Sequence, residues 1–165
     1  GGNGRRQPGA RIGVSDQPSV LVIAVGNPSR GDDALGPELA ARLEAASLPG
    51  VEVVTEFQLQ VENALDLVGR ERVVFVDAGT GTPGPFELRR AAPANEFLYT
   101  SHAISPEAVL ATYEKITGGV APESWVLCVR GESFGLGGAL PPAAAGNLGA
   151  AWLRLREICT REPSS

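Results

Sequence analysis

The feature that most constrains the fold is an alternation of short, uninterrupted apolar runs with helical patterns. The apolar runs are Val20–Val25, Arg72–Val76 and Ser124–Val129. Runs of this length without polar interruption are typical of strands that are buried on both faces of a sheet. The pattern predicts a three-layer α/β fold, in which helices cover both faces of a mostly parallel, twisted sheet of about five strands.

The remaining elements are read from periodicity and from helix-start signals. Two further strands are expected at Val51–Thr55 and, as an edge strand, at Phe86–Arg90. A helix is expected from Ser105, because Ser can cap a helix, Pro106 fits its first turn and Glu107 suits its positive end. Three other helices are expected at Pro37–Ala46, at Val61–Val68 and at Pro142–Thr160. Apolar faces are expected at Val61, Ala64, Leu65 and Val68; at Val109, Leu110, Tyr113 and Ile116; and at Leu148, Ala151, Trp152, Leu155 and Cys159.

The length of 165 residues fits one domain, which we place at residues 20–160 between disordered tails at 1–19 and 161–165. The N-terminal segment has no apolar core of the kind found in a secretory signal. The longest strictly apolar run is Val20–Val25, which is far too short to span a membrane. A net charge of −5 argues against nucleic-acid binding and against a polybasic membrane anchor.

The chain has two cysteines and one histidine. Two cysteines are too few for a disulfide scaffold, which fits a reducing cytosol and predicts a cytoplasmic protein. Cys128 lies in the apolar stretch WVLCV, where we expect a small buried hydrophobe. The single histidine, His102, excludes a site that is built from several histidines.

Three stretches imitate well-known motifs but lack the context that the motifs require. In GNPSRG (26–31), the Lys and Ser/Thr of a phosphate loop are replaced by Asp32 and Asp33. GTGTPG (79–84) has dinucleotide-site spacing, but the segment after it contains prolines and reads as extended rather than helical. GESFG (131–135) resembles a serine nucleophile elbow, but no helix pattern follows at once and the only histidine precedes it.

Three carboxylates and an imidazole follow predicted strands or precede a predicted helix. Asp32 and Asp33 follow the first strand, Asp77 ends the third, and His102 precedes the helix that starts at Ser105. Ligand sites of such sheets lie at the carboxyl ends of the strands, so these residues can share one site. Carboxylate and imidazole ligands suit Ni, Zn, Fe or Mn, and three protein ligands leave positions open for substrate. Each residue also has a structural alternative, as a turn former, a helix cap or a charge at a helix amino end.

The same residues fall within a wider resemblance. The stretch VLVIAVGNPSRGDDALGPELAARL, followed in order by RVVFVDAG, SHAISPEAVL and WVLCVRGESFGLGGALPP, resembles the [NiFe]-hydrogenase maturation endopeptidases. The resemblance runs from Val20 to about Leu155. The stretch EFQLQVENALDL, which contains Gln58 and Leu59, looks like the subgroup that serves soluble, bidirectional or NAD-linked hydrogenases.

The resemblance implies an aspartic-type, nickel-dependent endopeptidase. Such an enzyme removes a C-terminal peptide from the large-subunit precursor of a [NiFe]-hydrogenase after nickel insertion. By motif, the implied metal ligands are Asp33, Asp77 and His102, and Asp32 matches the second acid of the pair and is a candidate catalytic base. Gly26, Asn27 and Gly31 match the residues that shape the family's first loop.

Two departures from the family pattern stand out. Ala34 replaces a glycine, which would strain a backbone with positive φ, and GGALP lacks the glutamate of the late family motif. The resemblance further implies that the precursor supplies the nickel, that Cd or Zn can substitute for it in crystals, and that the protein is a monomer. Two alternatives stay open: a stand-alone metallohydrolase with its own Zn or Ni, and a non-catalytic hydrogenase assembly partner.

Overall fold

A computed structural model describes residues 17–26, 35–79, 84–94, 104–131 and 142–161. The elements are β1 (Val20–Val25), α1 (Leu35–Ala46), β2 (Val51–Glu56), the 3₁₀ helix η2 (Val61–Leu67), β3 (Arg72–Gly79), β4 (Phe86–Ala91), α2 (Pro106–Thr117), β5 (Glu123–Arg130) and α3 (Pro142–Thr160). The strands form one five-stranded sheet in the order β2-β1-β3-β5-β4. All neighbouring pairs are parallel except β4 with β5, which are antiparallel at the sheet edge.

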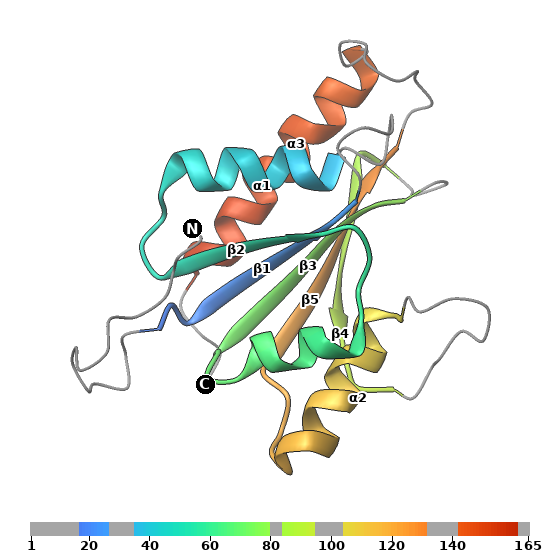
Figure 1. Cartoon of the computed structure of the whole chain (residues 1–165). Helices are drawn as coiled ribbons and strands as arrows, with labels where there is room; N and C mark the ends of the chain where they lie inside the picture. Colours follow the sequence, from blue (N-terminus) through green and yellow to red (C-terminus); the bar gives the residue numbers. More distant parts are fainter. Residues whose placement is uncertain (1–16, 27–34, 80–83, 95–103, 132–141, 162–165) are drawn as a thin grey trace.

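The sheet separates two apolar layers, and Figure 1 shows α1 and α3 on one face and η2 and α2 on the other. Successive strand residues alternate between these layers. In β1, Val22 packs with the α1/α3 layer, whereas Leu21 and Ile23 pack with the η2/α2 layer. The three-layer, mostly parallel fold predicted from the sequence is therefore confirmed.

The segment around residue 65 differs from its prediction. It forms a 3₁₀ helix with three residues per turn, so residues three apart share a face. Ala64 and Leu67 consequently face the core, while Leu65 is 60% exposed and Val68 is 47% exposed. The predicted face, which assumed 3.6 residues per turn, is wrong for this element.

The helix that follows Ser105 forms as its start signals predict. The Ser105 hydroxyl accepts a hydrogen bond from the Ala108 amide at 3.1 Å, and Pro106 occupies the first turn. The predicted apolar face of this helix is shorter than expected, because Ile116 near its end is exposed. In α3, Trp152 is only half-buried at the margin of the core.

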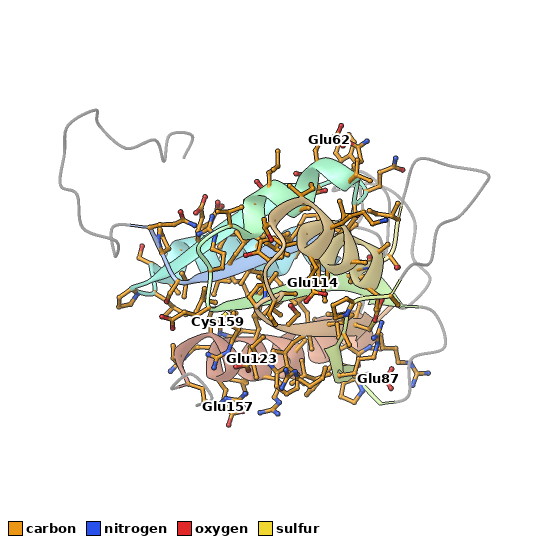
Figure 2. The ribbon with its side chains drawn as sticks, turned by 90° about the horizontal axis from the view of Figure 1, so that it is seen from below. Glu62, Glu87, Glu114, Glu123, Glu157 and Cys159 are labelled. Carbon is orange, nitrogen blue, oxygen red and sulfur yellow. The ribbon has the colours of Figure 1, made fainter. Side chains whose placement is uncertain are left out.

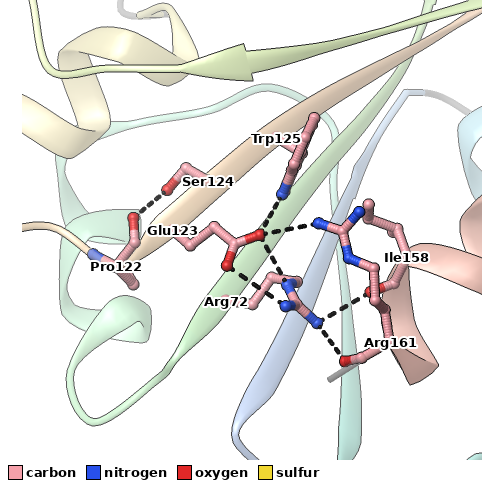
Figure 3. Close-up of polar contacts among 7 residues, drawn as sticks. All are labelled: Arg72, Pro122, Glu123, Ser124, Trp125, Ile158 and Arg161. Carbon is pink, nitrogen blue, oxygen red and sulfur yellow. Dashed lines mark hydrogen bonds and ion pairs between the residues drawn. The ribbon is translucent and has the colours of Figure 1, made fainter. Parts of the chain in front are cut away.

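A buried arginine closes the edge of the sheet where β1, β3 and β5 begin (Figure 3). The Arg72 guanidinium donates to both oxygens of Glu123, at 3.1 and 3.3 Å. Its Nη1 also donates to the carbonyls of Ile158 and Arg161, at 3.1 and 2.9 Å. The last turn of a helix leaves carbonyls without intrahelical donors, and Arg72 satisfies such a group at the end of α3.

Residues near both chain ends contact the domain. Gln17 Nε2 donates to the Val68 carbonyl at 2.7 Å, and the Ser19 carbonyl accepts from the amides of Glu71 and Arg72. Residues 1–16 and 162–165 of the expected tails lie outside the described residues, so the tail boundaries stay predictions. In the described part of the chain, no helix combines the length and the apolar character needed to cross a membrane.

Candidate functional site

The candidate site lies where the parallel strands end. Since β2, β1, β3 and β5 run in the same direction, their carboxyl ends meet at one edge of the sheet (Figure 1). The chain continues from this edge to α1 after β1, to η2 after β2, to β4 after β3 and to α3 after β5. We call this edge the carboxyl edge, and the opposite one, which holds Arg72, the amino edge.

Five residues, one from each strand, stand at the same level of the carboxyl edge. Val25 pairs with Glu56, Asp77 pairs with Cys128, and Cys128 pairs with Glu87. Val25 and Asp77 directly follow the paired residues of β1 and β3 and complete the row. Paired residues on neighbouring strands point to the same face, so the row alternates an acid, an apolar residue, an acid, a thiol and an acid.

Asp77 is the predicted site residue that the structure describes. It lies on the η2/α2 face, because Val73 and Phe75 in the same strand are buried on that face. The side chain is half-buried, and Oδ1 accepts a hydrogen bond from the Ala78 amide at 2.8 Å. This bond orients the carboxylate two residues before the end of β3, because the strand continues to Gly79 instead of ending at Asp77 as the sequence predicted.

Cys128 is the nearest neighbour of Asp77 across the strand pair. Burial raises the pKa of the Cys128 thiol above its ordinary value, and the Asp77 carboxylate raises this pKa further. The thiol is therefore protonated near neutral pH and contributes no charge to the row. The sequence predicted a small buried hydrophobe here, whereas the side chain is only half-buried and lies beside an acid.

One ion pair joins α2 to the sheet next to this row. The Arg89 guanidinium of β4 binds the Glu107 carboxylate in the first turn of α2. This hydrogen bond raises the pKa of Arg89, which burial lowers in part. The side chains that act electrostatically on Cys128 are the acids Asp77, Glu87 and Glu107 and the single cation Arg89. The described part of the row is thus acidic, which favours a cationic ligand.

A close backbone approach holds the first turn of α1 against the end of β1. A Cβ at Gly36, in the first turn of α1, would lie 2.5 Å from the Val25 carbonyl oxygen, so only glycine fits. At the start of the loop, Gly26 has a φ of 151°, and its amide donates to the Glu56 carbonyl at 2.9 Å. Both ends of the loop between β1 and α1 are therefore fixed at the carboxyl edge.

The other predicted site residues, Asp32, Asp33 and His102, lie outside the described residues. The same holds for Asn27, Gly31 and Ala34. Their joining with Asp77 in one metal site stays a prediction. Among the residues that the structure describes, no group of three or more His, Cys, Asp or Glu side chains is arranged to hold a metal ion.

A described residue near His102 anchors the entry to α2. The Ile104 amide donates to the Leu59 carbonyl at 3.2 Å, which ties this strand-like residue to the segment after β2. The site residues that the sequence analysis missed are Cys128, Glu87 and the Arg89–Glu107 pair. The register of β5 with β3 and β4 places Cys128 and Glu87 in the row of Asp77, and the ion pair with Arg89 joins Glu107 of α2 to β4. No local sequence signal reports such pairings between distant segments.

Two other parts of the molecule lack the features of a dinucleotide site or of a reactive cysteine. The glycine-rich stretch 79–84 leads into the strand β4 rather than a helix, which confirms that it lacks the helix amino end of a dinucleotide site. A cavity of about 250 Å³ lies at the amino edge, lined in part by Val20, Arg72 and Cys159. Burial raises the pKa of the Cys159 thiol to about 12, so this cavity offers no reactive thiolate.

Comparison with known proteins relates this fold to one group of enzymes. No protein-family model matches the chain, and no curated protein matches it in sequence. Among solved structures, the [NiFe] hydrogenase maturation protease HycI from Thermococcus kodakarensis KOD1 is 21% identical, with a TM-score of 0.63 over 89% of this chain and 96% of that one.

Two Escherichia coli structures are similar as well. The hydrogenase maturating endopeptidase HybD is 24% identical, with a TM-score of 0.61 over 82% of this chain and 88% of HybD. An endopeptidase solved in solution is 25% identical, with a TM-score of 0.59 over the same shares of the two chains. The resemblance predicted from the sequence is thus confirmed at the level of structure, and the chain has the fold of the [NiFe] hydrogenase maturation proteases.

Proposed function

We propose that the protein is an endopeptidase that removes the C-terminal extension of a [NiFe]-hydrogenase large-subunit precursor after nickel insertion. One observation carries the proposal. In a fold shared with hydrogenase maturation proteases, Asp77 is fixed at the carboxyl edge, where the sequence predicts an acidic metal ligand. Glu87 and Glu107, which act on the neighbouring Cys128 together with Asp77, add negative charge to this edge and support a site for a cation.

In this proposal, the nickel belongs to the substrate. Precursor thiolates hold the ion, and Asp33, Asp77 and His102 complete its coordination when the two proteins meet. The energy of this contact positions the scissile peptide bond, and a precursor without nickel lacks the contact. Water then attacks the peptide carbonyl, and Asp32 is our candidate for the base that accepts its proton.

The test compares nickel-loaded with nickel-free precursor. The released peptide is followed by mass spectrometry over time at equal protein concentrations. We expect the nickel-loaded precursor to be cleaved at least about 100-fold faster, which corresponds to about 2.7 kcal/mol of transition-state stabilisation. Equal rates for the two precursors would contradict nickel recognition while leaving the peptidase activity standing.

The same cleavage experiment, with metal analysis of the purified protein, distinguishes the proposal from a stand-alone metallohydrolase and from a non-catalytic assembly partner. A stand-alone metallohydrolase would retain Zn or Ni after purification and would cleave the nickel-free precursor. A non-catalytic assembly partner would bind the precursor and release no peptide. We expect neither pattern, and substitution of Asp33, Asp77 or His102 by Ala should each stop cleavage while the fold persists.

A further inference from the structure

Four exposed apolar side chains lie between the carboxyl edge and the end of η2, and Leu65 and Val68, three residues apart, share one face there. We define the apolar strip as Phe57, Val61, Leu65 and Val68, which are 72%, 46%, 60% and 47% exposed. The other large apolar side chains that are exposed in the described residues are Ile116, Val120 and Leu153, which lie on or just after α2 and on α3. Large apolar side chains that are exposed close together in the sequence mark interaction surfaces more often than scattered single residues do.

The strip is held rigidly, which makes it a defined surface. The Gln60 amide donates to Asn63 Oδ1 at 2.9 Å, and this capping interaction fixes the start of η2. Inward-facing Ala64 and Leu67 then anchor the helix to the core. With these residues buried, the exposed position of Leu65 follows from the 3₁₀ geometry and not from a loose segment.

Three acids that form no ion pair within the described part of the chain lie beside the apolar strip. A single amide group, Asn63 Nδ2, donates to both Glu56 Oε2 at 3.0 Å and Asp66 Oδ2 at 3.1 Å. Glu62 lies exposed at the periphery of the molecule (Figure 2). None of these three carboxylates forms an ion pair with another described residue, and the nearby Arg70 pairs with Glu52 at 2.8 Å.

The negative charge of these three acids indicates what kind of partner can bind the apolar strip. Two copies of the chain that met strip to strip would bring six carboxylates together, and like charges at an interface are strongly unfavourable. A partner that presents apolar side chains framed by Lys or Arg would instead bury the strip and neutralise its acids.

We propose that the apolar strip docks the folded body of the precursor through an apolar patch flanked by basic residues. This inference rests on the proposed function. Glu56 stands two strands from Asp77, and strands are about 4.8 Å apart, so the strip begins about 10 Å from the candidate site. A precursor bound to the strip would therefore present its C-terminal segment to the carboxyl edge.

The test uses Leu65→Glu, which puts a charge in the middle of the strip, with Leu153→Glu as its matched control. Leu153 is 64% exposed and lies on α3, on the opposite face of the sheet. We expect Leu65→Glu to raise KM for the nickel-loaded precursor at least about tenfold, with kcat and Tm unchanged. Leu153→Glu should keep the wild-type KM.

A second variant addresses charge. Glu62→Lys should weaken precursor binding, measured by calorimetry, and should reduce its dependence on salt, because a favourable pair becomes a repulsive one. If Leu65→Glu and Leu153→Glu give the same KM, the proposal is wrong. Loss of a wild-type dimer in Leu65→Glu, seen by sedimentation, would assign the strip to a second copy and would also overturn it.

Direct binding separates this proposal from the proposed function. If wild type binds the precursor and Leu65→Glu does not, the strip is the docking surface even when no peptide is released. In that case, only the peptidase assignment fails. If wild type does not bind the precursor, or if Leu65→Glu binds it with wild-type affinity, the docking proposal is contradicted whether or not cleavage occurs.

Discussion

The two edges of the sheet use charged residues in opposite ways. At the amino edge, each oxygen of Glu123 meets a guanidinium, and the Trp125 ring lies between Arg90 and Arg161, with ring centroid to guanidinium carbon distances of 5.1 and 5.3 Å. At the carboxyl edge, acids outnumber the single cation Arg89 among the groups around Cys128. Figure 2 shows the separation, with Glu62 and Glu87 toward one side and Glu123 and Cys159 toward the other.

This difference separates charged residues that stabilise the fold from charged residues that can bind a partner. A buried charge must be paired and hydrogen-bonded to be tolerated, and the amino edge meets this condition. An acidic edge that the chain does not neutralise in its described residues costs stability through mutual repulsion. Such a cost is typical of sites that bind a cation or another protein.

The largest loss of stability is expected for a substitution at the amino edge. Arg72→Met should lower the free energy of unfolding by about 3–5 kcal/mol, because it removes the buried donor of the Ile158 carbonyl and both Arg72 hydrogen bonds to Glu123, whose Oε2 keeps its bond from Trp125 Nε1. Urea denaturation measures the loss. Arg154→Met is the control, because Arg154 pairs with the exposed Glu157 on the surface of α3 and such pairs contribute about 0–1 kcal/mol. Equal losses in the two variants would show that the amino edge does not hold the fold.

A smaller loss of stability is expected for a substitution where α1 packs against β1. Gly36→Ala should lower the free energy of unfolding by about 1–3 kcal/mol, because the new methyl group would lie 2.5 Å from the Val25 carbonyl oxygen. Gly149→Ala, in the interior of α3, meets nothing within 4 Å and should raise it by about 0.5–1 kcal/mol. Thermal unfolding of both proteins gives the two signs, and a Gly36→Ala protein as stable as wild type would contradict the close approach.

The sequence specifies the layers of this fold well, because burial on both faces of β1, β3 and β5 leaves a direct apolar signature. The start of α2 at Ser105 is equally predictable, because the Ser105 cap bonds an amide only three residues away. The exposure of Leu65 was not predictable in this way. It depends on whether a seven-residue segment adopts 3.0 or 3.6 residues per turn, and packing against the core decides between them.

The residues of the candidate site also differ in whether the local sequence predicts their positions. The end of an apolar run predicts Asp77 near the carboxyl end of a strand, and the structure places it there, although β3 continues for two residues beyond it. The contacts of Asp77 with Cys128, and of Cys128 with Glu87, need the relative register of three strands that are distant in the sequence. The acidic pair Asp32–Asp33 and His102 rest on motif resemblance, and their place in the site remains a prediction.

Asp77→Asn tests the central claim most directly, because Asn keeps the size of the side chain and can still accept from the Ala78 amide. Loss of the carboxylate charge should also speed alkylation of Cys128 in a Cys159→Ser background, since that charge raises the thiol pKa. Glu44→Gln, on the exposed surface of α1, is the matched control.

The decisive readout is the rate at which each variant releases the C-terminal peptide from nickel-loaded precursor. We predict at least about a 100-fold loss for Asp77→Asn, with unchanged Tm, and a wild-type rate for Glu44→Gln. Wild-type release of the peptide by Asp77→Asn would contradict the assignment of the carboxyl edge as the site of cleavage.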